Sequence, residues 1–249
     1  MDFFYCVSTL RRPKQRTIVQ VRWFKPPAGW FKLNSDGASC GNPGKVGGGG
    51  IIRDCNGLWI KGFARSIGYA TSITAKFWAL RDGLKLALNE GIQRLIVELN
   101  AKVMVDLINS NAATNKLYAP LLYDYRYLLT RFIQVQVAHV YREGNRCADA
   151  FARWGSNMLE AFVVFDRPPN SNLLYLVSMD NVGMFVNRVS ELDPNSAVSF
   201  KLHISPLTPS PPASAATTLA PCQTRTLTAL RIASSSRALS GRTTRRSMP

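Results

Sequence analysis

The stretch FKLNSDGASCGNPGKVGGGGIIRDCNGLWIKGFAR (31–65) decides the fold of this chain of 249 residues. From Phe31 to Asp36 its side chains alternate between apolar and polar, as expected for a half-buried β-strand. The tetrapeptide GNPG (41–44) then marks a turn, because glycine and proline favour the backbone angles that turns require. The stretch therefore opens with a strand that ends in a tight turn.

Two more strands are predicted in the rest of this stretch. A glycine run (47–50) leads into two isoleucines, which begin a second apolar segment. The tetrapeptide DCNG (54–57) is typical of a hairpin turn, since Asn-Gly tolerates positive φ. Residues 58–65 then form the next apolar segment. We expect three consecutive strands, each antiparallel to the one before.

Farther along the chain the apolar period changes from that of strands to that of helices. Helices are predicted from Thr74 to Gly91, after Asn100, from Pro120, and from about Asn145 to Gly155, with strands at 95–99 and 133–137. The resulting order, β-β-β-α-β-α-α-β-α, indicates an α/β fold. Such an order suits a five-stranded mixed sheet with helices on its faces.

Composition divides the chain into four predicted segments. These are a basic N-terminal arm (1–26), a folded domain (27–157), a C-terminal extension (158–192) and a disordered tail (193–249). The extension has a weaker apolar pattern, which is compatible with either a strand or a helix. From Pro206 onward no acidic or aromatic residue occurs, so the tail is expected to bury too little apolar surface to fold.

The formal net charge of +16 points to a polyanionic partner. Residues 23–190 carry nineteen basic and twelve acidic side chains, so more than half of the excess lies in the flanking arms. Basic arms can contact phosphates nonspecifically, or they can be solvated tails without a partner. Charge alone leaves both interpretations open.

Cysteine usage and hydropathy limit the cellular compartment that can be expected for this protein. The five cysteines are odd in number and lack CxxC spacing, which favours a reducing compartment over a disulfide framework or a zinc module. The longest apolar runs are too short to span a bilayer, and no secretory signal pattern opens the chain. We expect a nuclear or cytoplasmic protein without a membrane partner.

Four separated stretches resemble, in order and spacing, the type 1 ribonuclease H domain. They are LNSDGASCGNPG (33–44), TAKFWALRDGL (74–84), VELNAKVMVDLI (97–108) and HVYREGNRCADAFA (139–152). Within that family the chain is similar to the plant branch that is often fused to retroelement reverse transcriptases. The resemblance covers about half of the chain and implies a ribonuclease H-like fold, in which the first, fourth and fifth strands lie side by side.

The resemblance also implies a reaction and its cofactors. Family members cleave the RNA strand of RNA–DNA hybrids with two Mg or Mn ions, which activate water and stabilise charge on the reacting oxygens. Hard oxygen ligands suit such ions, and in the family each of the four corresponding stretches supplies one carboxylate. Asp36 matches the carboxylate that bridges both metals, Asp149 matches the last one, and His139 matches a histidine that assists product release or proton transfer.

Each of these residues also has an ordinary structural explanation. Asp36 precedes a glycine, as in many turns, and His139 is in phase with a predicted strand. Asp149 could be a surface acid of a helix. The agreement of four motifs favours the remnant of a metal site over these alternatives.

Two carboxylate positions of the family are degenerate here. Lys76 and Asn100 occupy the second and third positions, which leaves a net charge of −1 where four carboxylates would carry −4. An ammonium about 4 Å from a divalent ion is repelled by roughly 8 kcal/mol at an effective dielectric constant of about 20. Asn100 can still cap a helix, or it can offer a neutral carbonyl to a metal as a weaker ligand. We therefore expect cleavage to be weakened or lost.

Three further residues are predicted to contact the nucleic acid: Asn42, Lys45 and Asn145. Three functions stay open at this point. The chain is a ribonuclease H, a non-catalytic relative that still binds hybrid duplexes, or a retroelement-derived remnant without a retained role.

Overall fold

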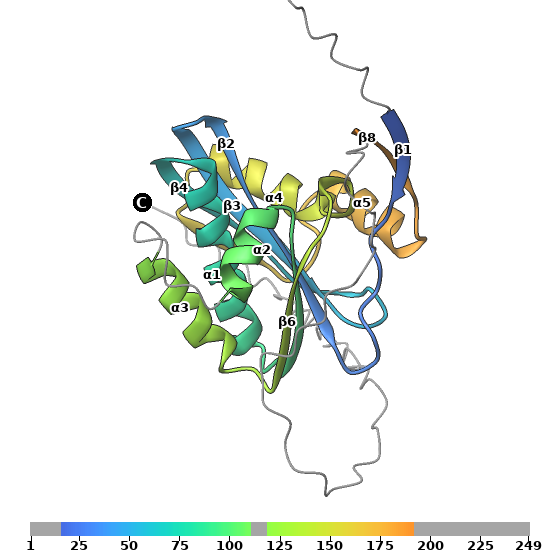
Figure 1. Cartoon of the computed structure of the whole chain (residues 1–249), viewed down its shortest axis with the longest axis horizontal. Coiled ribbons are helices and arrows are strands. Elements are labelled where there is room, and N and C mark those ends of the chain that lie inside the picture. The colour runs from blue at the N-terminus through green and yellow to red at the C-terminus, as the bar shows by residue number, and fades with distance from the viewer. Residues whose placement is uncertain (1–15, 111–118, 192–249) are drawn as a thin grey trace, which may run out of the picture.

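The computed structural model describes residues 16–110 and 119–191, which form one central sheet, a two-stranded ribbon and five helices (Figure 1). The elements are β1 (Arg16–Val21), β2 (Phe31–Gly41), β3 (Gly44–Arg53), β4 (Trp59–Ala70), α1 (Ser72–Asn89), β5 (Arg94–Leu99), α2 (Lys102–Asn109), α3 (Ala119–Leu129), β6 (Gln134–His139), the 3-10 turn η1 (Arg142–Gly144), α4 (Arg146–Asn157), β7 (Phe162–Phe165), α5 (Ser171–Asn181) and β8 (Val186–Glu191).

The central sheet has the strand order β6-β5-β2-β3-β4-β7. The pairs β2–β3 and β3–β4 are antiparallel, whereas β2–β5 and β5–β6 are parallel. The predicted α/β fold with a mixed sheet is thus confirmed, as is the central placement of the first strand of the domain beside the fourth and fifth. The predicted number of five strands is wrong, because β7 from the C-terminal extension pairs with β4 as a sixth strand.

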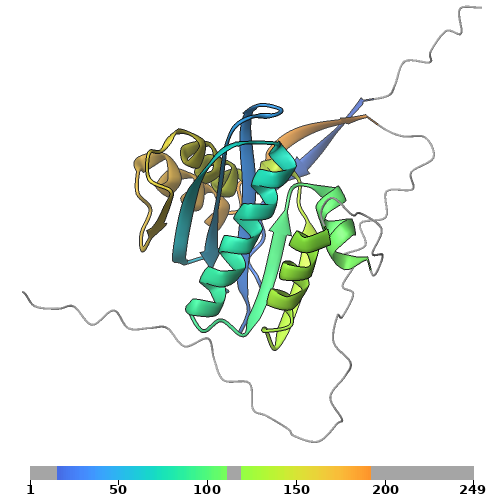
Figure 2. The same ribbon diagram turned by 90° about the vertical axis from the view of Figure 1, so that its left-hand side faces the viewer.

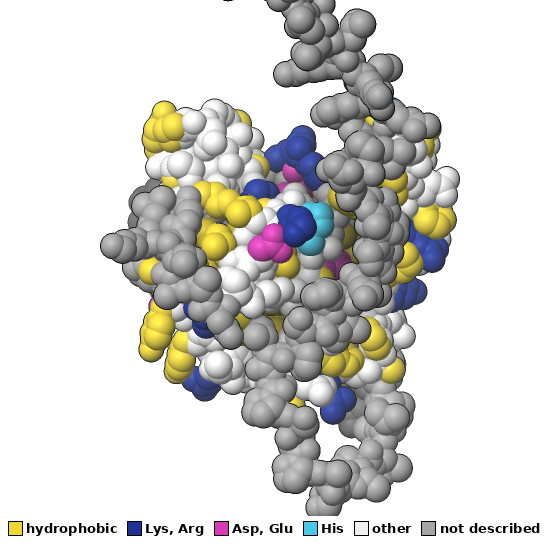
Figure 3. Space-filling view, in the orientation of Figure 1, with side chains coloured by type: hydrophobic (Ala, Val, Ile, Leu, Met, Phe, Trp, Pro, Cys, Tyr) yellow, Lys and Arg dark blue, Asp and Glu magenta, His cyan; other side chains and the backbone are white. Residues whose placement is uncertain are grey.

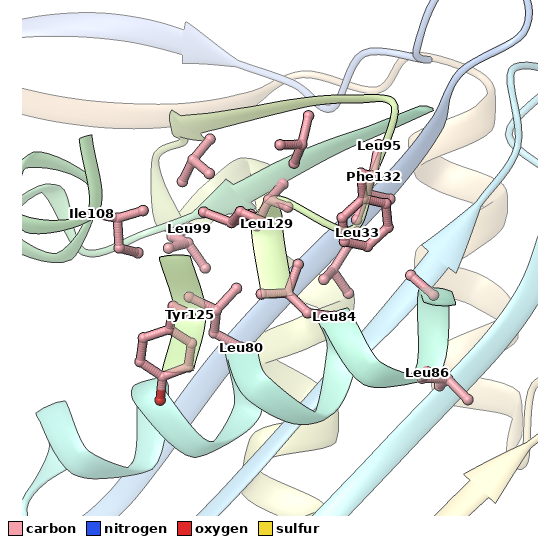
Figure 4. Close-up of a cluster of buried hydrophobic side chains, with 14 of the residues drawn as sticks. Leu33, Leu80, Leu84, Leu86, Leu95, Leu99, Ile108, Tyr125, Leu129 and Phe132 are labelled. Carbon is pink, nitrogen blue, oxygen red and sulfur yellow. The ribbon is translucent and has the colours of Figure 1, made fainter. Parts of the chain in front are cut away.

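Helices cover both faces of the sheet (Figure 2). On one face, α1, α2 and α3 bury a large apolar cluster that includes Leu33, Leu80 and Leu84 (Figure 4). On the other face, α4 and α5 pack over a smaller cluster around Ile51 and Phe151. The functional helices α1 and α4 therefore approach the same strands from opposite sides.

Glycines in β2 and β3 let these two helices come unusually close to the sheet. A Cβ at Gly37 would lie 2.3 Å from the backbone nitrogen of Lys76, and one at Gly49 would lie 2.6 Å from Cβ of Phe151. Real side chains do not tolerate such distances, so only glycine permits this packing. The close approach brings α1 against β2, which carries Asp36, and brings α4 against Gly49 of β3, the residue that pairs with Asp36.

The described residues of both flanking segments are part of the folded unit. Strand β1 pairs antiparallel with β8, so residues 16–21 of the predicted basic arm are extended and hydrogen-bonded. The C-terminal extension, for which the sequence left strand and helix open, contains both. Sequence reasoning missed the β1–β8 ribbon because its two strands lie far apart in the chain and neither forms a hairpin. The predicted tail (193–249) lies outside the described residues.

Local boundaries differ slightly from the predicted ones. Helix α1 begins earlier than expected, because Thr71 is the N-cap and accepts a hydrogen bond from the backbone of Thr74. Helix α4 continues past Gly155 to Asn157. Within the described ranges, no helix combines the length and the apolar character that a membrane span requires.

Candidate functional site

The four positions singled out by the sequence meet at one pocket. Asp36 comes from β2, Lys76 from α1, Asp149 from α4, and Asn100 directly follows β5. The pocket is lined by Asp36, Gly37, Ala38, Ser39, Cys40, Gly41, Asn42, Ser72, Lys76, Asn100, Arg142, Asp149, Arg153, Ser156 and Asn157. The fold therefore assembles the predicted constellation from four different elements.

Asp36, Lys76 and Asn100 form a closed ring of contacts. The Lys76 ammonium forms a salt bridge to Oδ1 of Asp36 and donates to Oδ1 of Asn100 at 2.8 Å. Asn100 Nδ2 donates to Oδ2 of Asp36 at 2.7 Å, and the backbone nitrogen of Gly37 donates to Oδ1 of Asp36 at 2.7 Å. The Asn100 amide can serve a cation and a carboxylate at once because it carries both an acceptor and donors. Both oxygens of the buried Asp36 carboxylate are thus occupied.

Asp149 is held by two arginines. Arg142 from η1 donates from Nη2 to Oδ1 of Asp149 at 2.6 Å, and Arg153 pairs with Oδ2 at 3.0 Å. Hydrogen bonding to Asp149 and the charge of that carboxylate raise the pKa of Arg142, so its guanidinium stays charged. The arginine side chains are about 60% exposed, whereas Asp149 is 17% exposed. Asp149 therefore lies beneath a basic rim.

These residues do not fit a pair of divalent ions. Such a centre needs several oxygen ligands with net negative charge, yet each of the two carboxylates already has a cationic partner. Among the described residues, no group of three or more His, Cys, Asp or Glu side chains could hold a metal ion. Glu98 does not supply a missing carboxylate, because it pairs with Lys32 at 2.5 Å.

His139 lies at the end of β6, beside Leu99 of β5, and is not among the residues that line the pocket. Its imidazole contacts the Tyr141 ring edge-on at 5.5 Å between centroids. Figure 3 shows basic, acidic and histidine side chains gathered at the surface on this side of the molecule. Partial burial and the charge of Lys102 lower the pKa of His139, so the neutral form is favoured near neutral pH.

The predicted nucleic-acid contacts divide into exposed and buried residues. Asn42 lies in the exposed β2–β3 turn at the edge of the pocket, and its Oδ1 accepts from the backbone nitrogen of Ser72 at 3.2 Å. Lys45 is exposed on β3, next to the same turn. Of the two, Asn42 lines the pocket and Lys45 does not.

Asn145 is placed differently. Its side chain is only 1% exposed, donates to the backbone oxygen of Ser35 at 3.1 Å and accepts from Asn34 at 3.1 Å. The structure therefore gives Asn145 a role in fastening α4 to β2, in place of the predicted contact with nucleic acid. The capping role considered for Asn100 is likewise absent from α2, whose N-cap is Ala101.

Sequence reasoning missed the two arginines that hold Asp149. Arg153 follows Asp149 by four residues on the same helix, and this spacing predicts an ion pair. Arg142 lies across the η1 turn, and no local pattern signals its contact. The sequence therefore indicates one of the two ion pairs of the basic rim, and the other is visible only in the tertiary structure.

Comparison with known families agrees with this geometry. Residues 34–155 match the model of a family described as "Reverse transcriptase-like", and this range includes all four positions of the site. The chain contains a type 1 ribonuclease H domain. The ribonuclease H family generally uses divalent metal ions. The domain has the fold of this family, but the side chains at its site do not fit such ions.

Individual relatives show how much of each protein is shared. A protein of Arabidopsis thaliana whose name assigns it to the ribonuclease H proteins is 35% identical over 167 residues. This alignment covers 66% of the present chain, which spans about a quarter (26%) of that relative. A solved ribonuclease H1 of the archaeon Halobacterium salinarum NRC-1 is 28% identical, with a TM-score of 0.48, and the match covers 51% of this chain and 96% of that one.

Proposed function

We propose that the ribonuclease H domain binds RNA–DNA hybrid duplexes and cleaves them weakly or not at all. The observation that carries this proposal is the position of Lys76, whose ammonium lies against Asp36 and Asn100 at the centre of the site. A bound divalent ion at Asp36 would have to displace this ammonium or tolerate its repulsion. The family's metal-dependent reaction is therefore disfavoured at this site.

The rest of the domain supports retention of binding. The core, the strand order and the glycine contacts that shape the pocket are intact. Asn42 and Lys45 lie exposed beside the pocket, and residues 23–190 carry more basic than acidic side chains. An A-form hybrid presents 2′-hydroxyls and phosphates across a wide, shallow minor groove, which a polar and basic surface can follow.

Fluorescence anisotropy with the full chain tests the binding. A labelled hybrid should bind more tightly than the matching single strands, and the affinity should fall as salt is raised, since displaced counterions favour association. Equal affinities for the hybrid and for single strands, over several salt concentrations, would reject selective binding.

Incubation of the same labelled hybrid with Mg or with Mn tests the cleavage. We expect little or no RNA product on a denaturing gel in either metal. Rapid cleavage that is lost when Asp36 is replaced by Asn would show that the native site is active, contrary to the proposal. A chain that neither binds nor cleaves would favour the retroelement-derived remnant.

A further inference from the structure

The charges that line the pocket favour an anionic ligand over a metal ion. Its charged residues are two acids, Asp36 and Asp149, and three bases, Lys76, Arg142 and Arg153. The remaining lining residues are neutral, and several carry polar donors. The pocket thus has one positive charge more than it has negative charges, and its carboxylates are already paired.

We propose that this pocket is a metal-independent site for a backbone phosphodiester of a nucleic acid, with Lys76 in place of the family's ions. The inference rests on the proposed hybrid binding and names the group that the pocket recognises. Phosphate oxygens accept hydrogen bonds from ammonium and guanidinium groups, and such charge-assisted bonds are the stronger ones.

Each of these three basic side chains can make such a contact. An ammonium has three donors, and Lys76 directs two of them to Asp36 and Asn100. Arg142 uses Nε and Nη2 toward Asp149, while its Nη1 belongs to a side chain that is largely exposed at the rim. Arg153 contacts Asp149 through Nε. A guanidinium offers five donors, so both arginines can also face an anion.

The carboxylates also favour this arrangement. Without counter-ions, Asp36 and Asp149 would repel a phosphate, but the salt bridges to Lys76 and to the two arginines neutralise them locally. Asn100 contributes no charge where the family has a carboxylate. The two degenerate positions thus act together, since one adds a cation and the other removes an anion.

The test compares hybrid binding by the full chain, in EDTA and in Mg, for Lys76→Met and for Lys85→Met. Lys85 lies on the same helix, is exposed and is not among the pocket-lining residues, so it controls for the lost charge. We expect chelation to leave the wild-type affinity unchanged, Lys76→Met to weaken binding about tenfold, and Lys85→Met to weaken it less than about twofold. Lys76→Arg should retain most of the affinity because it keeps the charge.

A second variant guards against misfolding. Arg142→Gln at the exposed rim should also weaken binding by more than the control, while its thermal unfolding matches that of the wild type. Loss of wild-type binding on chelation would overturn the inference. So would an equal effect of Lys76→Met and Lys85→Met in folded proteins. A complete lack of hybrid binding by the wild type, even at low salt, would instead reject the proposed function itself.

The source of the phosphate is tested with hybrids that carry or lack 5′-phosphates. A backbone site predicts the same effect of Lys76→Met on both. An effect confined to the phosphorylated hybrid would overturn the assignment to a backbone phosphodiester and identify a terminal monophosphate as the ligand.

Discussion

At the residue scale, Lys76 and Asn100 decide the electrostatic character of the candidate site. Lys76 gives the Asp36 carboxylate an internal counter-ion, and Asn100 completes the ring without adding charge. Four carboxylates at these positions would repel one another in the absence of cations. In the present arrangement, Asp36 and Asp149 are each paired with cationic side chains of the protein itself.

The double variant Lys76→Glu with Asn100→Asp tests whether these two residues alone block the reaction. It restores four carboxylates, and we expect it to bind Mg or Mn and to cleave the RNA strand of a hybrid. Each single reversion should give much less activity, because the ligands of one metal site act as a unit. Calorimetric titration with metal and gel analysis of the hybrid measure the two effects.

The control for this experiment is Asp36→Asn in the reverted protein, which should abolish the gained cleavage. A double variant that folds but stays inert in both metals would contradict the prediction. In that case the arginines around Asp149 would be the next candidates, because they would still occupy the fourth carboxylate.

The titration of His139 provides a second prediction at this scale. Partial burial and the nearby ammonium of Lys102 lower its pKa from the ordinary value of 6.5. Removing that ammonium in Lys102→Ala weakens the repulsion of the imidazolium, so the pKa of His139 should rise. The chain has only two histidines, and NMR of a His203→Gln variant assigns the signal of His139.

The same shift fixes the sign of a pH effect on stability. Because folding lowers the pKa of His139, the folded state binds fewer protons than the unfolded state just below pH 6.5. The neutral imidazole of His139 therefore contributes stability above pH 6.5, and this contribution is lost as the pH falls through the pKa of His139 in the folded state. An unchanged pKa of His139 in Lys102→Ala would show that the Lys102 ammonium does not contribute to the shift.

At the scale of elements, α5 is fastened to the domain by a buried ion pair. Asp180 of α5 contacts Arg53 of β3 at 2.8 Å, and the two side chains are 2% and 1% exposed. The Arg53 guanidinium also stacks on the Trp23 ring at 3.6 Å, and Arg146 of α4 reaches Asp180 at 3.2 Å. One carboxylate thus connects α5 to the sheet and to α4.

Asp180→Asn should strongly destabilise the protein, because it leaves the buried Arg53 guanidinium without its counter-ion and also removes the partner of the partly buried Arg146. Breaking a buried pair from one side costs about 3–5 kcal/mol. The matched control is Asp166→Asn, whose carboxylate is 81% exposed and pairs with Lys61. An exposed pair contributes about 0–1 kcal/mol. Urea unfolding of both variants measures the difference, and equal midpoints would contradict this account.

At the scale of the whole molecule, segments from both ends of the described chain complete the domain. The C-terminal extension supplies β7 to the sheet, α5 to one face and β8 to the ribbon, and the N-terminal segment supplies β1. The pocket itself lies entirely within residues 36–157. The pocket residues and the flanking segments are therefore separate in sequence but packed together in the fold.

A fragment of residues 27–157 should consequently be much less stable than a fragment of residues 16–191. It retains the pocket but lacks Asp180, so Arg53 and Arg146 lose their counter-ion, and it lacks the apolar residues of α5 that cover α4. Thermal unfolding followed by circular dichroism compares the two fragments. Equal melting temperatures would show that the flanking segments contribute little.

Local patterns in the sequence predicted the parts of this protein that depend on near neighbours. The strand at Phe31, the GNPG turn (41–44) and the hairpin at 54–57 are confirmed because alternation and turn residues act within a few positions. The four positions predicted from the motifs line one pocket, although they lie far apart in the chain.

Tertiary structure decided the contacts between distant segments. Arg53 and Asp180 are 127 residues apart, and no period in either segment indicates that they pair. The same holds for the β1–β8 ribbon and for the burial of Asn145. The sequence predicted which residues replace the family's carboxylates, but only the fold placed the Lys76 ammonium against Asp36. The physical reason is that burial and counter-ions are properties of packed elements, which no single stretch of chain possesses.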